Sequence, residues 1–126
     1  MYQVVKEIRP EDAEMRAAFA ATMDELAAQD SAVVYFDCDV INSIGMTGFS
    51  KKYPDRCVDC GIQEANMIGA ASGASAVGLK PFTHTFGPFA ARRVIDQVYI
   101  SAAYAKMNVR MIGSDAGITA SYNGGT

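Results

Sequence analysis

Histidine, cysteine and long apolar runs are all scarce in this sequence. Its 126 residues include one histidine, His84, and three cysteines, and residues 1–7 lack the basic-then-apolar layout of a secretory signal. A structural zinc site normally needs four ligands, so a zinc-stabilised fold is not expected. The longest uncharged run, residues 65–79, is shorter than the roughly 20 residues that cross a bilayer. We therefore predict a cytoplasmic chain with free thiols and no membrane contact.

Excess charge of either sign is also absent. The 11 basic and 14 acidic residues give a formal net charge of −3. So small an imbalance creates no field that would attract nucleic acid or an anionic membrane. Hydrophobic residues make up 50% of the chain, which is ordinary for a globular domain of this length. We expect one domain over residues 1–126.

Helical and strand patterns alternate along the chain. Apolar spacing predicts helices over residues 10–29, 48–52, 62–77 and 88–106. Short apolar runs predict strands over residues 31–37, 56–59, 80–85 and 108–113. The first strand is apolar without interruption, which is typical of a strand buried on both faces of a parallel sheet. The sequence thus predicts an α/β fold with three layers, a parallel sheet with helices on both faces.

Loops rich in polar and small residues follow the predicted strands. They cover residues 38–43, 61–64, 85–89 and 113–117. Ligands of open parallel sheets bind at the carboxyl ends of the strands. We expect these four loops to converge on one site.

Glu64 is a single carboxylate in an otherwise uncharged stretch of glycine, alanine, methionine and isoleucine. Desolvation in such surroundings favours the protonated form of a carboxyl group, so the group can hold or share a proton near neutral pH. This is the behaviour of an acid or base. The alternative is an ordinary glutamate in the first turn of a helix, stabilised by the helix dipole.

Three other candidate motifs carry less weight. Asp39 belongs to a D-x-D pattern that could bind a metal, but the pattern is frequent by chance and no further ligand cluster supports it. Cys57 and Cys60 have the C-x-x-C spacing, but an odd offset within one strand points them to opposite faces. A helix that started at Cys60 would reopen a redox interpretation. His84 is expected to be a strand residue with a satisfied hydrogen bond.

Two segments carry a family resemblance. PDR at residues 54–56, followed by GIQEANM at residues 61–67, resembles the cofactor-activating segment of the transketolase family of thiamine diphosphate enzymes. TFGPFAARRVIDQ at residues 85–97 is similar to a second family segment that packs on the cofactor pyrimidine. The resemblance implies the thiamine diphosphate-binding fold, and within it the pyrimidine-binding domain. It also implies that Glu64 is the catalytic glutamate, which hydrogen-bonds a nitrogen of the pyrimidine ring.

The same resemblance assigns the remaining site residues. The cofactor-binding residues are Asp39, Val40, Glu64, Phe86 and Phe89. Without the resemblance, the two aromatic residues would be interpreted as core, because burying rings is the default. Ser43 and Asp115 take positions that contact substrate. Relatives often carry, at the position of Asp115, a histidine that binds substrate phosphate, and an aspartate would repel phosphate.

The resemblance implies a partner as well. No Gly-Asp-Gly segment, which holds the diphosphate through a metal, occurs in the sequence. We therefore expect a diphosphate-binding transketolase N-terminal subunit that holds Mg²⁺ or Ca²⁺, in a heterotetramer. The implied activity, absent from this chain alone, is transfer of a two-carbon ketol unit from a ketose to an aldose. The turn-forming residues 121–126 predict that the sequence is a piece of a longer chain.

Other functions remain open at this point. Deoxyxylulose-phosphate synthase and the beta subunits of 2-oxoacid dehydrogenases are built on the same half-domain and differ in the acyl donor. A hypothesis from a different class is a non-catalytic binding or redox module that has kept the fold.

Overall fold

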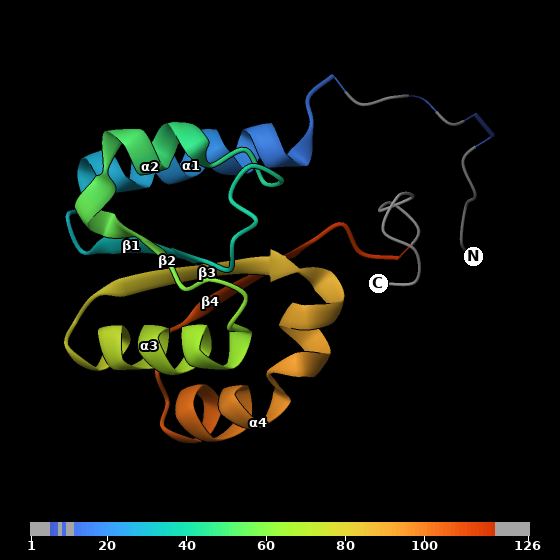
Figure 1. Ribbon diagram of the computed structural model, residues 1–126. Helices are drawn as coiled ribbons and strands as arrows, with labels where there is room; N and C mark the ends of the chain where they lie inside the picture. The colour runs from blue at the N-terminus through green and yellow to red at the C-terminus, as the bar shows by residue number, and fades with distance from the viewer. Residues whose placement is uncertain (1–5, 8, 10–11, 118–126) are drawn as a thin grey trace.

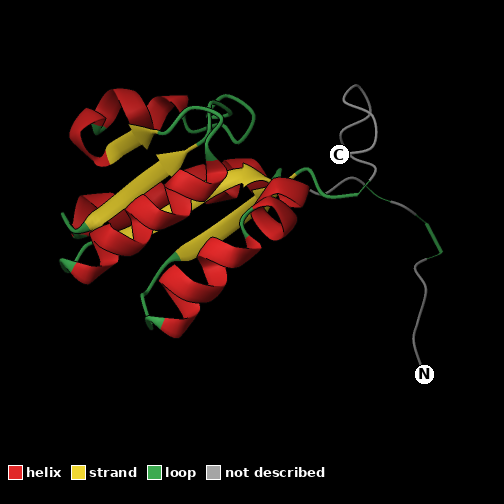
Figure 2. Cartoon of the chain, turned by 60° about the horizontal axis from the view of Figure 1, so that its bottom comes forward, coloured by secondary structure: helices red, strands yellow, loops and turns green. Residues whose placement is uncertain are grey.

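A parallel sheet forms the centre of the structure, a computed structural model that describes residues 6–7, 9 and 12–117. Its strands lie in the order β2-β1-β3-β4, and every pairing is parallel. The strands are β1 (Val33–Asp37), β2 (Cys57–Asp59), β3 (Lys80–Phe86) and β4 (Arg110–Ser114). Their arrows point toward the same edge of the sheet in Figure 2. The predicted parallel sheet is confirmed.

Helices cover both faces of the sheet. Figure 1 shows α1 (Met15–Gln29) and α2 (Thr47–Lys52) on one face, and α3 (Glu64–Ala76) and α4 (Ile95–Gln97) on the other. Shorter helical turns complete the connections: η1 (Pro54–Arg56), η2 (Phe89–Arg93) and η3 (Val98–Tyr104). The three-layer α/β arrangement is therefore confirmed. Among the described residues, none of the helices is long and apolar enough to cross a membrane.

Strand β1 supplies side chains to two apolar clusters, because all five of its residues are buried. Tyr35 is fully buried on the α1 side, and Phe36 is buried on the α3 side. The cluster under α1 and α2 contains Met23, Ala27, Val33, Tyr35, Ile44, Met46 and Phe49. The cluster under α3 contains Val34, Phe36, Cys38, Met67, Ile68, Ala71 and Val94. The apolar run thus specifies a strand buried on both faces, as expected.

The first helix begins later than the sequence predicted. Pro10 lies outside the described residues, residues 12–14 are not helical, and α1 starts at Met15. Glu14 has an extended backbone, and its carbonyl accepts the first hydrogen bonds of the helix. Only part of the expected apolar face is used, since Met23 and Ala27 are buried whereas Met15 is 82% exposed.

The helix expected over residues 88–106 is interrupted. It consists of the π-helical turns η2 and η3 with the short α4 between them. Residues 89–104 contain no glycine or proline that would have signalled the irregularity. Single π-helical turns occur frequently at functional sites. Here η2 carries Phe89 and Arg93, so the irregular winding positions two side chains of the candidate site.

A close backbone contact fixes the turn that follows β3. A Cβ atom added to Gly113 on β4 would lie 2.9 Å from the Cα atom of Gly87. Real Cβ contacts are not that short, so only glycine fits at position 113. This contact seats the turn after β3, and with it the start of η2, against the end of β4.

Candidate active site

Two groups of polar side chains lie at the carboxyl ends of the strands, on opposite faces of β3. Thr85 contacts Glu64 on the α3 side, whereas His84 contacts Asp37 and Ser114 on the other side. Neighbouring strand residues alternate in direction, which explains the separation. The Glu64 cluster consists of Glu64, Thr85, Phe89 and Arg93, and the Phe86 ring lies beside that of Phe89. The His84 cluster consists of Tyr35, Asp37, His84 and Ser114.

Glu64 is the first residue of α3 and is only 3% exposed. Arg93 Nη1 donates to both carboxylate oxygens, at 3.0 Å to Oε1 and 2.9 Å to Oε2. The Thr85 hydroxyl donates to Oε1 at 3.3 Å. The sequence correctly predicted a buried glutamate at a helix start. The expectation of uncharged surroundings is wrong, because the Arg93 guanidinium forms an ion pair with the carboxylate.

Arg93 also covers an aromatic ring of the same cluster. Its guanidinium carbon lies 3.9 Å from the centroid of Phe89, and its side chain is 46% exposed. Phe86 and Phe89 are a tilted pair with centroids 6.4 Å apart. Neither phenylalanine belongs to the two apolar clusters of the described chain. The alternative that these rings are core residues therefore loses its support, and a carboxylate and an aromatic face lie together at the sheet edge.

The loop after β1 contains the predicted residues Asp39 and Val40. Asp39 has a left-handed backbone with φ 62°, a conformation that is uncommon for non-glycine residues outside turns and functional loops. Asp59 Oδ1 accepts hydrogen bonds from the backbone N–H groups of Asp39, at 3.0 Å, and of Gly61, at 2.9 Å. Asp59, which the sequence reasoning missed, thus ties the loops after β1 and β2 together.

The D-x-D metal interpretation finds no support within the part of the chain that the structure describes. No group of three or more histidine, cysteine, aspartate or glutamate side chains is placed there to hold a metal ion. The first aspartate of the pattern, Asp37, is fully buried and accepts a hydrogen bond at 2.7 Å from the backbone N–H of Val40. Asp37 therefore stabilises the loop after β1 through this hydrogen bond.

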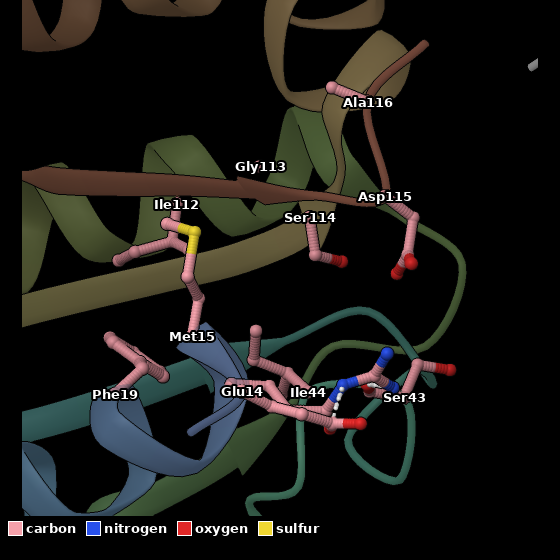
Figure 3. Close-up of a pocket in the computed structure, with 11 residues that line it drawn as sticks. Glu14, Met15, Phe19, Ser43, Ile44, Ile112, Gly113, Ser114, Asp115 and Ala116 are labelled. Carbon is pink, nitrogen blue, oxygen red and sulfur yellow. Dashed lines mark hydrogen bonds and ion pairs between the residues drawn. The ribbon is translucent and has the colours of Figure 1, made fainter. Parts of the chain in front are cut away.

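A cavity of about 590 Å³ lies between the end of β4 and the start of α1. Figure 3 shows Ser114 and Asp115 pointing from the end of β4 toward the loop that carries Ser43. Arg16 also lines the cavity; it forms an ion pair with Glu14 at 3.0 Å and donates to the Ser43 carbonyl at 3.1 Å. The structure therefore brings both predicted substrate residues, Ser43 and Asp115, to one cavity. That cavity does not include the Glu64 cluster.

The His84 cluster leads from the buried sheet to this cavity. Asp37 Oδ2 lies 2.8 Å from His84 Nδ1 and accepts from the Tyr35 hydroxyl at 2.7 Å. His84 Nε2 lies 2.9 Å from Ser114 Oγ, and Ser114 lines the cavity. The prediction of a hydrogen-bonded strand histidine is confirmed. Its partners were not predictable from local pattern, because the pairing of β3 with β1 and β4 decides them.

The cysteines lie in surroundings that keep thiols protonated. Burial raises the pKa of Cys57 to about 11 and that of Cys38 to about 12, and it also raises the pKa of Cys60. Cys57 packs against the cluster under α1, and Cys60 against the cluster under α3. Their opposite directions are as predicted, and neither forms a disulfide. Helix α3 begins at Glu64, so no helix start at Cys60 reopens the redox interpretation.

An open parallel sheet that carries polar side chains and aromatic rings at its carboxyl edge defines a ligand-binding α/β domain. Residues 11–126 match the family described as "Transketolase, pyrimidine binding domain". The chain therefore belongs to the transketolase family, as its pyrimidine-binding domain. Membership of this family implies dependence on thiamine diphosphate.

Individual relatives agree with the family. The chain is 47% identical, over 95% of its length, to the 6-deoxy-6-sulfo-D-fructose transketolase subunit SqwH of Clostridium sp. (strain MSTE9). It is 33% identical, over 82% of its length, to an apulose-4-phosphate transketolase subunit of Phocaeicola vulgatus. A 1-deoxy-D-xylulose-5-phosphate synthase of Mycolicibacterium gilvum is 34% identical over 86% of the chain.

A solved structure shares the fold. The split gene transketolase described as an inactive beta4 tetramer superimposes with a TM-score of 0.71 at 36% identity, covering 78% of this chain and 33% of that one. The two transketolase subunits are covered over 37% and 33% of their length, and the synthase over 17%. The chain thus spans about a third of the length of the transketolase subunits that it matches.

Proposed function

We propose that this chain is the pyrimidine-binding part of a thiamine diphosphate-dependent transketolase, which moves a two-carbon ketol unit from a ketose to an aldose. The contact of Arg93 with Glu64 and Phe89 is the observation that supports this most. The guanidinium is a planar group of N–H donors that lies over the ring and donates to the carboxylate. An aminopyrimidine is also planar and also has N–H donors, so the same carboxylate and ring suit it.

Each predicted cofactor-binding residue then has a part in holding the cofactor. Glu64 would share a proton with a ring nitrogen of the pyrimidine, and Phe86 and Phe89 would pack on the ring. Asp39 and Val40 form the neighbouring wall. When bound, the cofactor supplies the carbon nucleophile that carries the two-carbon unit. Arg93 has room to move aside, because nearly half of its side chain is exposed.

A second chain completes the site in this proposal. Two relatives are named as transketolase subunits, and this supports a second chain. The partner is a diphosphate-binding transketolase N-terminal subunit that holds the cofactor diphosphate through Mg²⁺ or Ca²⁺. In this proposal the chain belongs to the pyrimidine-binding domain of an enzyme that is assembled as a heterotetramer in the cytoplasm.

The substrate carries a sulfonate in place of the usual phosphate. Asp115 lines the cavity where a phosphate-binding histidine would stand in many relatives, and its carboxylate repels an anion. A phosphate monoester carries a charge of about −1.5 to −2 near neutral pH, whereas a sulfonate carries a single negative charge and is repelled less. The relative at 47% identity is a 6-deoxy-6-sulfo-D-fructose transketolase subunit. We therefore propose a sulfonated ketose as the donor.

A donor panel tests the proposal. The full-length chain, purified with its partner, thiamine diphosphate and Mg²⁺, is assayed with 6-deoxy-6-sulfo-D-fructose, xylulose 5-phosphate and pyruvate. We expect preference for the sulfonated ketose, and a shift of about 10-fold toward xylulose 5-phosphate in Asp115→His, which corresponds to about 1.4 kcal/mol. Turnover of xylulose 5-phosphate that Asp115→His leaves unchanged would contradict the substrate assignment.

The remaining outcomes separate the alternative functions. Decarboxylation of pyruvate would favour a deoxyxylulose-phosphate synthase or the beta chain of a 2-oxoacid dehydrogenase. A protein that binds no thiamine diphosphate, is unaffected by Glu64→Gln and responds to oxidation of Cys57 and Cys60 would be a non-catalytic or redox module.

A further inference from the structure

The His84 cluster is a buried network of polar groups on the face of β3 opposite to Glu64. Asp37 and His84 are both fully buried, and the series of hydrogen bonds ends at Ser114, a half-buried residue that lines the cavity. Buried ionisable pairs rarely add stability over apolar residues of similar volume. Stability of the fold therefore does not explain a polar network that extends from inside the sheet to a cavity, and its position indicates a functional role.

The hydrogen bonds fix where the protons lie. Asp37 accepts at Oδ1 from the backbone N–H of Val40 and at Oδ2 from the Tyr35 hydroxyl. The Tyr35 hydroxyl keeps its proton, because burial and the nearby Asp37 carboxylate raise its pKa. Both oxygens of Asp37 thus act as acceptors, which is the arrangement of an ionised carboxylate, and the relay takes Asp37 in that form. His84 Nδ1 must then carry the proton that it shares with Asp37 at 2.8 Å.

This tautomer determines what Ser114 offers to the cavity. With Nδ1 protonated, Nε2 of a neutral His84 has a free lone pair and accepts the Ser114 hydroxyl proton over 2.9 Å. Ser114 Oγ then presents only lone pairs to the cavity, beside the carboxylate of Asp115 (Figure 3). Two adjacent acceptors suit the hydroxyl groups of a sugar.

We propose that Ser114, His84 and Asp37 form a proton relay that removes a proton from a hydroxyl group of the ketose substrate. This inference rests on the proposed transketolase function. Ser114 Oγ takes the substrate proton while its own proton passes to His84 Nε2, and Asp37 stabilises the imidazolium that results. The electron pair left on the substrate oxygen forms the carbonyl of the departing aldose as the carbon–carbon bond breaks. The pair of that bond stays with the two-carbon unit.

The surroundings of His84 are compatible with this role. Among the described residues, Asp37 from β1 contacts His84 and Tyr35 contacts Asp37, whereas Asp115, Glu14 and Arg16 line the cavity beside Ser114. The charge of Arg16 is balanced by its ion pair with Glu14. Asp37 is therefore the charged group in contact with the imidazole, and it stabilises the protonated state that the relay needs. Ser114 is the catalytic residue in this assignment, and His84 and Asp37 act through it.

The first measurement is made on the full-length, ¹⁵N-labelled chain without cofactor. Nitrogen chemical shifts of His84, identified by comparison with His84→Gln, report which ring nitrogen carries the proton. We expect the Nδ1–H tautomer, with an Nε2 signal that changes in Ser114→Ala. A proton on Nε2 of the neutral ring would overturn the relay, because Ser114 would then be unable to pass its proton to His84.

The second measurement uses the assembled enzyme with thiamine diphosphate and Mg²⁺. Ser114→Ala should lower kcat/KM for the ketose donor by about 10²-fold, the lower end of general-base effects, with cofactor affinity unchanged. Ser114→Thr keeps the hydroxyl and should restore most of the rate. His84→Gln removes the acceptor of the Ser114 proton and should lower kcat/KM about as much as Ser114→Ala does. The matched control is Ser72→Ala, which removes a buried hydroxyl that bonds only within α3.

The outcomes distinguish the relay from the function on which it rests. Turnover by the wild type together with a Ser114→Ala rate within twofold of Ser72→Ala would overturn the relay and leave the transketolase assignment intact. A wild-type assembly that binds no cofactor and turns over no ketose would overturn both.

Discussion

The ion pair between Glu64 and Arg93 gives the sharpest stability prediction. Arg93→Met keeps the aliphatic stem and removes the guanidinium, which leaves the buried carboxylate with the hydrogen bond from the Thr85 hydroxyl at 3.3 Å. Breaking a fully buried pair costs about 3–5 kcal/mol, and breaking an exposed pair costs at most about 1 kcal/mol. Glu64 is 3% exposed and the Arg93 side chain 46% exposed, so we expect about 2 kcal/mol.

A double-mutant cycle isolates that contribution. The free energy of unfolding of the full-length chain is measured by urea denaturation, without cofactor, for the wild type, Arg93→Met, Glu64→Gln and the double variant. Glu64→Gln removes the charge, so Arg93→Met should cost little in that background, and the coupling energy should be about 1–2 kcal/mol. A coupling energy below about 0.3 kcal/mol would refute the reasoning that Arg93 compensates the buried carboxylate.

Two further predictions concern the thiols and the glycines. The pKa of Cys57 is raised to about 11, so its thiolate is scarce at pH 7. Iodoacetamide should therefore modify Cys57 about 10²-fold more slowly than an exposed cysteine. A rate equal to that of free cysteine would contradict the burial of this thiol. Gly113→Ala should lower the free energy of unfolding by about 1–3 kcal/mol, because its Cβ would lie 2.9 Å from Gly87 Cα. The matched control is Gly73→Ala in α3, where an added Cβ meets nothing within 4 Å. This substitution should be neutral or should stabilise the isolated chain by up to about 1 kcal/mol. Equal losses of stability at both positions would contradict the close contact between Gly113 and Gly87 as the cause.

The elements that the sequence predicted well are those decided by local pattern. The uninterrupted apolar run of β1 predicted a strand buried on both faces, and with it the three layers. The loop after β2 leads directly into a long helix, so the position of Glu64 at the start of that helix was also predictable. The odd spacing of Cys57 and Cys60 predicted opposite directions within one strand; the two thiols do pack against different clusters, although β2 ends at Asp59. Each of these features depends on residues close together in the chain.

The features that escaped prediction depend on residues far apart. Arg93 reaches Glu64 across 29 positions, and His84 meets Asp37 only because β3 pairs with β1 in a register that sets these two residues side by side. The π-helical winding of η2 and η3 has no glycine or proline to signal it. Asp37 and His84 each lie in a predicted strand, which was a weak signal of a buried polar pair. The sequence alone did not show that the two strands are neighbours.

The central claim is that Glu64 activates thiamine diphosphate at the sheet edge, and exchange of the cofactor's thiazolium C2 proton with deuterium tests it most directly. Exchange is followed by quenched-flow NMR in the assembled full-length enzyme without sugar substrate. We predict that the wild type accelerates exchange strongly over free cofactor, and that Glu64→Gln binds the cofactor but loses about 10²-fold or more of the acceleration. Equal exchange rates in the wild type and in Glu64→Gln, with cofactor bound to both, would contradict the account.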